Sequence, residues 1–323
     1  MSARPGSALA ATAGSVLVGM LVAFQARANG ELADRLGGGF SGGAQAALVN
    51  FLTGLALVTG WVLALSSQRR AVRAIPARLG RGGLGWWNSL AGLGGAFLIL
   101  SQAASVPRLG VAVFTVAVVA GQTGGSLAVD QVGLGPAGRQ PVTVRRAVAA
   151  VVAVGAVVLA VSGRLGSAGF SPVLALVCVA AGVAVSGQSA LNGRVGQAVG
   201  SPVAAAWLNF VVGASALGVT VAGLAAAGHR LGTLPATWWL YTGGPAGLAF
   251  VAVVAAAVRA VGVLLVALAT VAGQVVGAVA LDAVAPASGQ SLQASTLVGA
   301  VLTVLAVLVA MDLRAKGRPV QPH

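Results

Sequence analysis

The sequence predicts an all-α integral membrane protein with ten transmembrane helices, arranged as two inverted five-helix repeats with both termini in the cytoplasm. Three observations support this prediction. The 323 residues are 58% hydrophobic and 7% charged, with a mean hydropathy of +0.95, a composition typical of proteins that have lipid as their solvent. Apolar stretches long enough to cross a bilayer recur along the whole chain. The first half of the chain also returns in the second half.

The repeat is clearest in one polar-and-glycine motif. The sequence GQTGGSLAVD at residues 121–130 returns as GQVVGAVALD at residues 273–282, and 8 of 16 positions are identical over residues 115–130 and 267–282. Three more motifs recur: Gly-x5-Gln-x3-Asn-Gly at 19–30 and 182–193, Asn-Phe-x-x-Gly at 50–54 and 209–213, and a Trp doublet at 86–87 and 238–239. We therefore expect two structural units, residues 1–166 and 167–323.

The apolar stretches define the expected helices in order. They lie near residues 8–26, 44–66, 84–104, 110–130 and 144–163, and then near 170–190, 203–227, 238–257, 260–282 and 294–313. The first stretch, with Ala-Arg-Ala at 26–28, imitates a secretory signal, but its recurrence near residue 182 favours a retained membrane helix. The break between the third and fourth stretches rests on Pro107 and Arg108.

The distribution of basic residues predicts the orientation. If the amino terminus is cytoplasmic, the segments on its side hold 14 Lys and Arg residues, and the segments on the other side hold 5. Residues 66–83 contribute five arginines and are expected to be a cytoplasmic loop that meets anionic headgroups. Because each repeat has an odd number of helices, the second repeat crosses the membrane in the opposite sense to the first.

Paired amides are the main candidates for a substrate site. Gln122 and Gln274 are expected near the middle of their helices, where an amide must bond either a neighbouring helix or a substrate. Both roles remain open for them. The other repeated amides are Gln25, Gln188, Asn29, Asn192, Asn50 and Asn209.

Asp130 and Asp282 close equivalent helices and are candidates for coupling or gating, because carboxylates at membrane depth are costly. The alternative is that both are helix-end residues that bond a following loop. The sequence has no phosphate-binding Gly-Lys-Ser/Thr loop, no metal-ligand cluster and no nucleophile beside a base, so we predict no enzyme activity, cofactor or metal. Despite a net charge of +14, the arginines lie between apolar stretches, so no nucleic-acid partner is expected.

Taken as a set, these motifs resemble the YdcZ-like family of the drug/metabolite transporter superfamily. The resemblance also includes Pro107-Arg108-Leu109-Gly110 and Val132-Gly133-Leu134 and spans about residues 14–313. It implies a fused ten-helix transporter of the bacterial inner membrane, an exporter or metabolite permease. Small multidrug resistance proteins of the same superfamily carry a Glu in their first helix, whereas this chain has Gln25 and Gln188 there.

We therefore expect a secondary transporter of a small metabolite or drug-like molecule that works by alternating access between the inverted repeats. Its expected partners are the lipid bilayer and the substrate, with the proton as a candidate coupling ion and a homodimer left open. One alternative is a channel-like facilitator, which the same repeats permit. Another is a membrane scaffold subunit that transports nothing.

Overall fold

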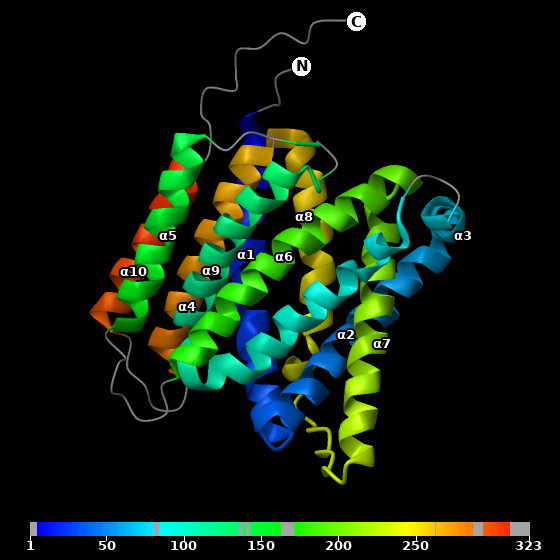
Figure 1. Cartoon of the computed structure of the whole chain (residues 1–323), viewed down its shortest axis with the longest axis horizontal. Helices are drawn as coiled ribbons and strands as arrows, with labels where there is room; N and C mark the ends of the chain where they lie inside the picture. Colours follow the sequence, from blue (N-terminus) through cyan, green and yellow to red (C-terminus); the bar gives the residue numbers. More distant parts are fainter. Residues whose placement is uncertain are drawn as a thin grey trace, which may run out of the picture.

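The computed structural model describes residues 5–80, 84–135, 138–139, 143–162, 171–261, 263–286 and 293–310, and this part of the chain contains helices and no strand (Figure 1). Two short 3-10 helices at the Trp doublets, η1 (Trp86–Leu90) and η2 (Trp238–Tyr241), precede α4 and α8. The α-helices are α1 Pro5–Arg35, α2 Gly39–Ala64, α3 Ser66–Gly80, α4 Ala91–Val132, α5 Val144–Ser162, α6 Pro172–Val199, α7 Pro202–Ala226, α8 Gly243–Val261, α9 Val263–Val284 and α10 Ala294–Ala310.

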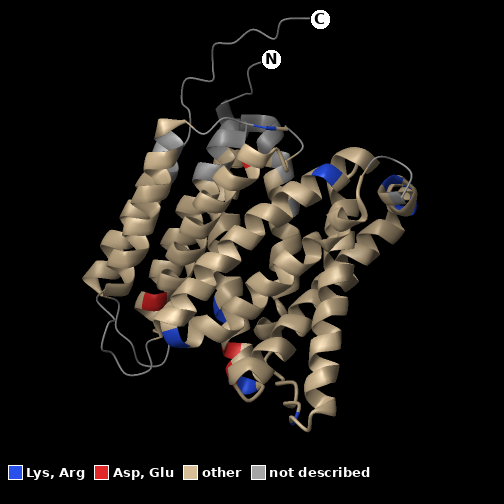
Figure 2. Ribbon diagram, in the orientation of Figure 1, with Lys and Arg blue, Asp and Glu red and all other residues tan. Residues whose placement is uncertain are grey.

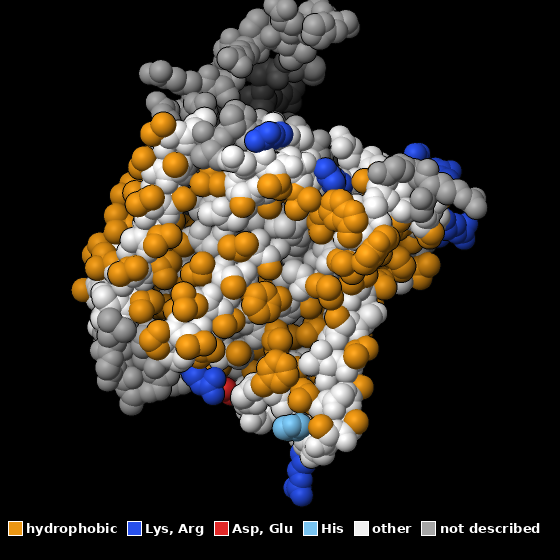
Figure 3. Space-filling view, in the orientation of Figure 1, with side chains coloured by type: hydrophobic (Ala, Val, Ile, Leu, Met, Phe, Trp, Pro, Cys, Tyr) orange, Lys and Arg blue, Asp and Glu red, His pale blue; other side chains and the backbone are white. Residues whose placement is uncertain are grey.

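The helices are suited to a lipid environment. Five of the described segments are long and apolar enough to cross a membrane: Leu9–Arg35, Gly39–Ala64, Trp86–Val132, Pro172–Val199 and Pro202–Ala226. Shorter apolar helices accompany them. Lys, Arg, Asp and Glu gather near the two ends of the described helices (Figure 2), and hydrophobic side chains cover the face between them (Figure 3). The chain is a multi-pass membrane protein.

Helix α4 is two helices joined at a sharp break. At 1.5 Å per residue, its 42 residues would extend about 63 Å, roughly twice the thickness of a bilayer's hydrocarbon core. Gly110 interrupts it with φ 79° and ψ 164°, a conformation that favours glycine, and the second half returns along the bundle (Figure 1). The predicted break near Pro107 and Arg108 is confirmed, although the non-helical residue is Gly110.

The prediction of a loop at residues 66–83 was wrong about its secondary structure, because Ser66–Gly80 forms the amphipathic helix α3. Ala71 and Ile75 are buried against Ala204 of α7, whereas Arg70 and Arg73 are exposed. The periodic apolar positions among the arginines, which composition alone hides, allow this helix to lie against the bundle. Residues 81–83 lie outside the described residues.

Helices from the two halves of the chain pack in matching pairs. α1 packs against α8 and α9, and α6 packs against the two halves of α4. By the sequence repeat, α6 corresponds to α1, and the two halves of α4 correspond to α8 and α9. α2 packs against α7, and α5 against α10 (Figure 1). The predicted boundary at residues 166 and 167 falls within 163–170, outside the described residues.

The repeated Asn-Phe-x-x-Gly motif explains one of these pairs. A side chain at Gly54 would overlap the ring of Phe210, and one at Gly213 would overlap the ring of Phe51. The two rings meet edge to face with their centroids 5.4 Å apart. Each glycine thus makes room for the other repeat's phenylalanine where α2 and α7 cross.

The repeated Gly-Gln motif serves two other crossings. A side chain at Gly121 would overlap the backbone of α6 at Val179, and one at Gly273 would overlap the backbone of α1 at Val16. Small residues of this kind let helices approach closely in lipid. The glutamine that follows each glycine is therefore fixed beside a tight contact between the two repeats.

Candidate functional site

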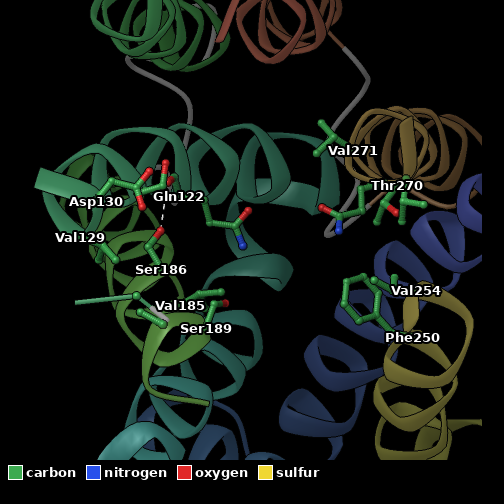
Figure 4. Close-up of a pocket in the computed structure, with 15 residues that line it drawn as sticks. Gln122, Val129, Asp130, Val185, Ser186, Ser189, Phe250, Val254, Thr270 and Val271 are labelled. Carbon is green, nitrogen blue, oxygen red and sulfur yellow. Dashed lines mark hydrogen bonds between the residues drawn. The ribbon is translucent and has the colours of Figure 1, made fainter. Parts of the chain in front are cut away.

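The second half of α4 forms a cavity together with α6, α8 and α9. The cavity has a volume of about 520 Å³. In Figure 4, Gln122, Asp130, Ser186 and Ser189 lie on one side of a gap and Phe250 and Thr270 lie on the other. Its lining also includes Gly135, in the loop after α4, so the cavity runs from the middle of that helix to its carboxyl end. The pocket is large enough for a small organic molecule.

Gln122 and Gln274 both line the cavity. Each follows a glycine at a crossing between the repeats, as described above. The Ser186 hydroxyl donates a hydrogen bond of 2.9 Å to the backbone carbonyl of Gln122, which ties α6 to α4 at this level. The two amides can therefore offer donors and acceptors to a bound molecule from opposite halves of the chain.

The remaining polar groups of the lining are mostly hydroxyls. Thr270 is 5% exposed, and its hydroxyl has no hydrogen-bond partner among the described residues. Buried hydroxyls usually have a partner, so a ligand or water is the natural acceptor here. Asp130 lies near the carboxyl end of α4, and no Lys, Arg or His is among the described residues of the lining. The lining combines amides and hydroxyls with apolar and aromatic side chains.

Most of the other repeated amides bond one another away from the cavity, and the cluster in the first half is buried. In the first half, Asn29 Nδ2 donates to Gln102 Oε1 at 2.7 Å, and Asn50 Nδ2 donates to Asn29 Oδ1 at 2.9 Å. A side chain at Gly243 of α8 would overlap the Asn50 amide, so this cluster is closed by the other repeat. These contacts join α1, α2 and α4, the role expected of amides that connect membrane helices.

The second half has a related cluster. Gln188 Nε2 and Asn192 Nδ2 both donate to Asn209 Oδ1, at 3.0 and 3.2 Å, and join α6 to α7. Gln25 is buried on α1, and it is not among the residues that line the cavity. Sequence reasoning missed Gln102, because its counterpart in the second repeat is Val254 and repetition gave no signal.

Asp282 has a well-defined structural position. It is 3% exposed, and its two carboxylate oxygens accept hydrogen bonds from the backbone N–H groups of Val111 (2.9 Å) and Ala112 (2.8 Å). These donors belong to the first turn after the break at Gly110, where an α-helix has unpaired N–H groups. Asp282 of α9 therefore caps the second half of α4. Asp130, its counterpart, lines the cavity instead.

The described helices form a multi-pass membrane bundle with a cavity lined by amides, hydroxyls and apolar side chains, an arrangement suited to a membrane transporter. The chain belongs to the YdcZ family: the family model described as "Putative inner membrane exporter, YdcZ" matches residues 10–159 and 173–309. This confirms the resemblance noted in the sequence. The description of the family is that of a membrane exporter.

Comparison with solved structures supports the fold alone. One similar chain, described only as the crystal structure of a protein, has a TM-score of 0.50 and 18% sequence identity, and the match covers 95% of this chain and 97% of that chain. No curated protein matches the chain.

Proposed function

We propose that the protein is a secondary exporter of a small metabolite or drug-like molecule, which it moves by alternating access between two inverted five-helix repeats. The observation that carries this proposal is the cavity between helices of both halves, with Gln122 from one repeat and Gln274 from the other in its lining. A midplane site at the interface of inverted repeats is the arrangement from which two mirror-related states arise.

The proposed topology counts ten crossings, because α4 crosses twice and α3 lies on the surface. α1 begins, and α10 ends, at the same end of the bundle (Figure 1). The exposed arginines of α3 lie toward that end (Figure 2), which supports its assignment to the cytoplasm of a bacterium under the positive-inside rule.

The cavity runs toward the same end, since it extends from Gln122 to Asp130 and Gly135. Under the proposed scheme, this cavity belongs to the state that is open to the cytoplasm. Asp130 is the proposed coupling carboxylate, because it lines the cavity near the carboxyl end of α4. Asp282 acts in gating as the cap that holds the opposite end of α4 and α9 together.

The test is transport in liposomes that contain a pH-sensitive dye, screened with amino acids, nucleosides, organic cations and amphipathic amides. Gln122→Ala should reduce the rate of transport at least tenfold, because it removes one of the two central amides, and Asp130→Asn should abolish substrate-dependent proton flux. Gln197→Ala is the matched control, since Gln197 is an exposed amide of α6 outside the cavity lining.

The alternatives predict other outcomes. Substrate flux that does not saturate, with no proton flux and no effect of Asp130→Asn, would favour the channel-like facilitator. Absence of flux for the whole panel, in protein that is folded and fully reconstituted, would favour the scaffold.

A further inference from the structure

Each wall of the cavity has a counterpart elsewhere in the chain because the sequence repeats. A shift of 152 residues relates the two halves of α4 to α8 and α9, and a shift of 163 residues relates α1 to α6. These shifts carry the cavity residues Ser186, Ser189, Phe250, Val266, Thr270 and Ser126 onto Ala23, Ala26, Leu98, Phe114, Val118 and Ala278.

These six counterparts, which we name the outer cluster, lie together in the fold. Five of them are buried, with exposures from 1% (Ala26 and Ala278) to 6% (Val118), and Leu98 packs against them. Leu109 and Val111, on either side of the break in α4, belong to the same apolar core. The Asp282 cap holds α9 to that break. The space equivalent to the cavity is therefore filled by apolar side chains.

The two sides differ in chemistry as well as in packing. Four positions that carry hydroxyls around the cavity are apolar in the outer cluster: Ser126, Ser186, Ser189 and Thr270 correspond to Ala278, Ala23, Ala26 and Val118. The outer counterpart of Val254 is Gln102, but its carbonyl oxygen already accepts a hydrogen bond from Asn29. Two counterparts are charged: Arg27, which follows Ala26 on α1, corresponds to Ala190, and Asp282, near the end of α9, corresponds to Asp130.

Gln122 and Gln274 are the exception, because the shift of 152 residues carries each onto the other. The same two amides would therefore line the cavity in either state. We propose that the outer cluster is the exit half of the substrate pathway, and that the substrate is a compact amphipathic molecule. Its polar group stays on the central amides while its apolar body passes the outer cluster. This inference rests on the proposed alternating access.

The substrate class follows from the cost of unpaired polar groups. A molecule with one amide or carbonyl group can satisfy it at the two glutamines in both states. A sugar carries a hydroxyl on almost every carbon, and the alanines, leucine, valine and phenylalanine of the outer cluster give these hydroxyls no partner. The exit half therefore selects against polyhydroxylated molecules.

The first experiment measures which side of the membrane reaches each half. In a Cys178→Ala background, single cysteines replace Ser189 in the cavity and Ala26 in the outer cluster, and a membrane-impermeant maleimide is added to inside-out or right-side-out vesicles. Ser189→Cys should react from the cytoplasmic side, and Ala26→Cys should react from neither side. Adding Ser186→Phe, which fills the cavity, should raise labelling of Ala26→Cys from the outer side at least fivefold.

Leu176→Phe is the matched control, because Leu176 is 68% exposed on the same helix and should leave both patterns unchanged. If Ser186→Phe blocks labelling of Ser189→Cys but Ala26→Cys still does not react, the assignment of the exit half is overturned. Transport that still depends on Gln122 would show in that case that the proposed function stands. If Ala26→Cys stays protected and transport does not depend on Gln122, both the assignment of the exit half and the proposed function are overturned.

The second experiment tests the substrate class in liposomes. Phenylacetamide, an uncharged amphipathic molecule with one amide, should be transported at least tenfold faster than glucose. The triple variant Ala23→Ser, Ala26→Ser and Ala278→Ser, which gives the exit half the hydroxyls of the cavity, should reduce this preference. Equal rates for the two probes in the wild type, or an unchanged preference in the triple variant with transport intact, would overturn the inference.

Discussion

Replacing Asp282 by Asn should destabilise the fold by removing part of a buried cap. The side chain is 3% exposed and accepts two backbone hydrogen bonds at 2.9 and 2.8 Å. Hydrogen bonds to a charged group contribute about 1.5–3 kcal/mol each, and a lost helix cap costs about 0.5–2 kcal/mol. The Asn side chain keeps one oxygen that can accept a hydrogen bond, but its NH₂ group faces the second backbone N–H, and two donors cannot bond each other.

The expected loss is therefore about 2–3 kcal/mol, close to one charged hydrogen bond. For a chain of 323 residues that corresponds to a fall in melting temperature of roughly 3–5 °C. The assay heats the purified protein in detergent and measures, by size-exclusion chromatography, the fraction that remains folded at each temperature. Glu31→Gln is the control, since its pair with Arg35 is partly exposed and contributes at most about 1 kcal/mol.

One result would refute this reasoning. If Asp282→Asn melts at the wild-type temperature yet loses all substrate-dependent proton flux, the carboxylate couples transport and does not act mainly as a cap. A lower melting temperature with residual flux in the remaining folded protein would support the cap.

Three further predictions concern packing. Gly213→Val should lower stability by about 1–3 kcal/mol because its side chain would overlap the ring of Phe51, whereas Gly218→Val on the same helix has open space and should change little in the same thermal assay. Asn50→Leu should cost about 1–3 kcal/mol, since it leaves the buried Asn29 carbonyl without its donor, and a melting curve unchanged from the wild type would contradict that role. Cys178, which is 0% exposed, should react with maleimide only after denaturation; rapid labelling of the native protein would show that α6 opens there.

Much of the fold could be predicted from the sequence because lipid imposes few solutions. Helices in a bilayer need about 20 apolar residues each, so hydropathy alone located the helices, and the break in α4 lay near the predicted Pro107 and Arg108. The helix α3 was missed because its apolar residues are few among the arginines. They become significant only when Ala71 and Ile75 meet Ala204 of α7.

The candidate site could be predicted only in part. Repetition singled out eight amides, but it could not say which of them face a cavity and which face each other. Gln122 and Gln274 line the cavity, whereas Asn29 and Asn50 bond one another. An amide at membrane depth needs a partner in either case, so the sequence signal of both roles is the same.

The sequence by itself determined the class of this protein, its repeats and the residues worth asking about, because composition and periodicity record the solvent and the history of the chain. Only the tertiary structure decided that Asp282 caps α4, that the glycine motifs are crossings between repeats, and that one half of the proposed pathway is open while its counterpart is packed. Contacts such as the one between Val111 and Asp282 join residues that lie 171 positions apart in the chain, so composition and repetition alone could not place them.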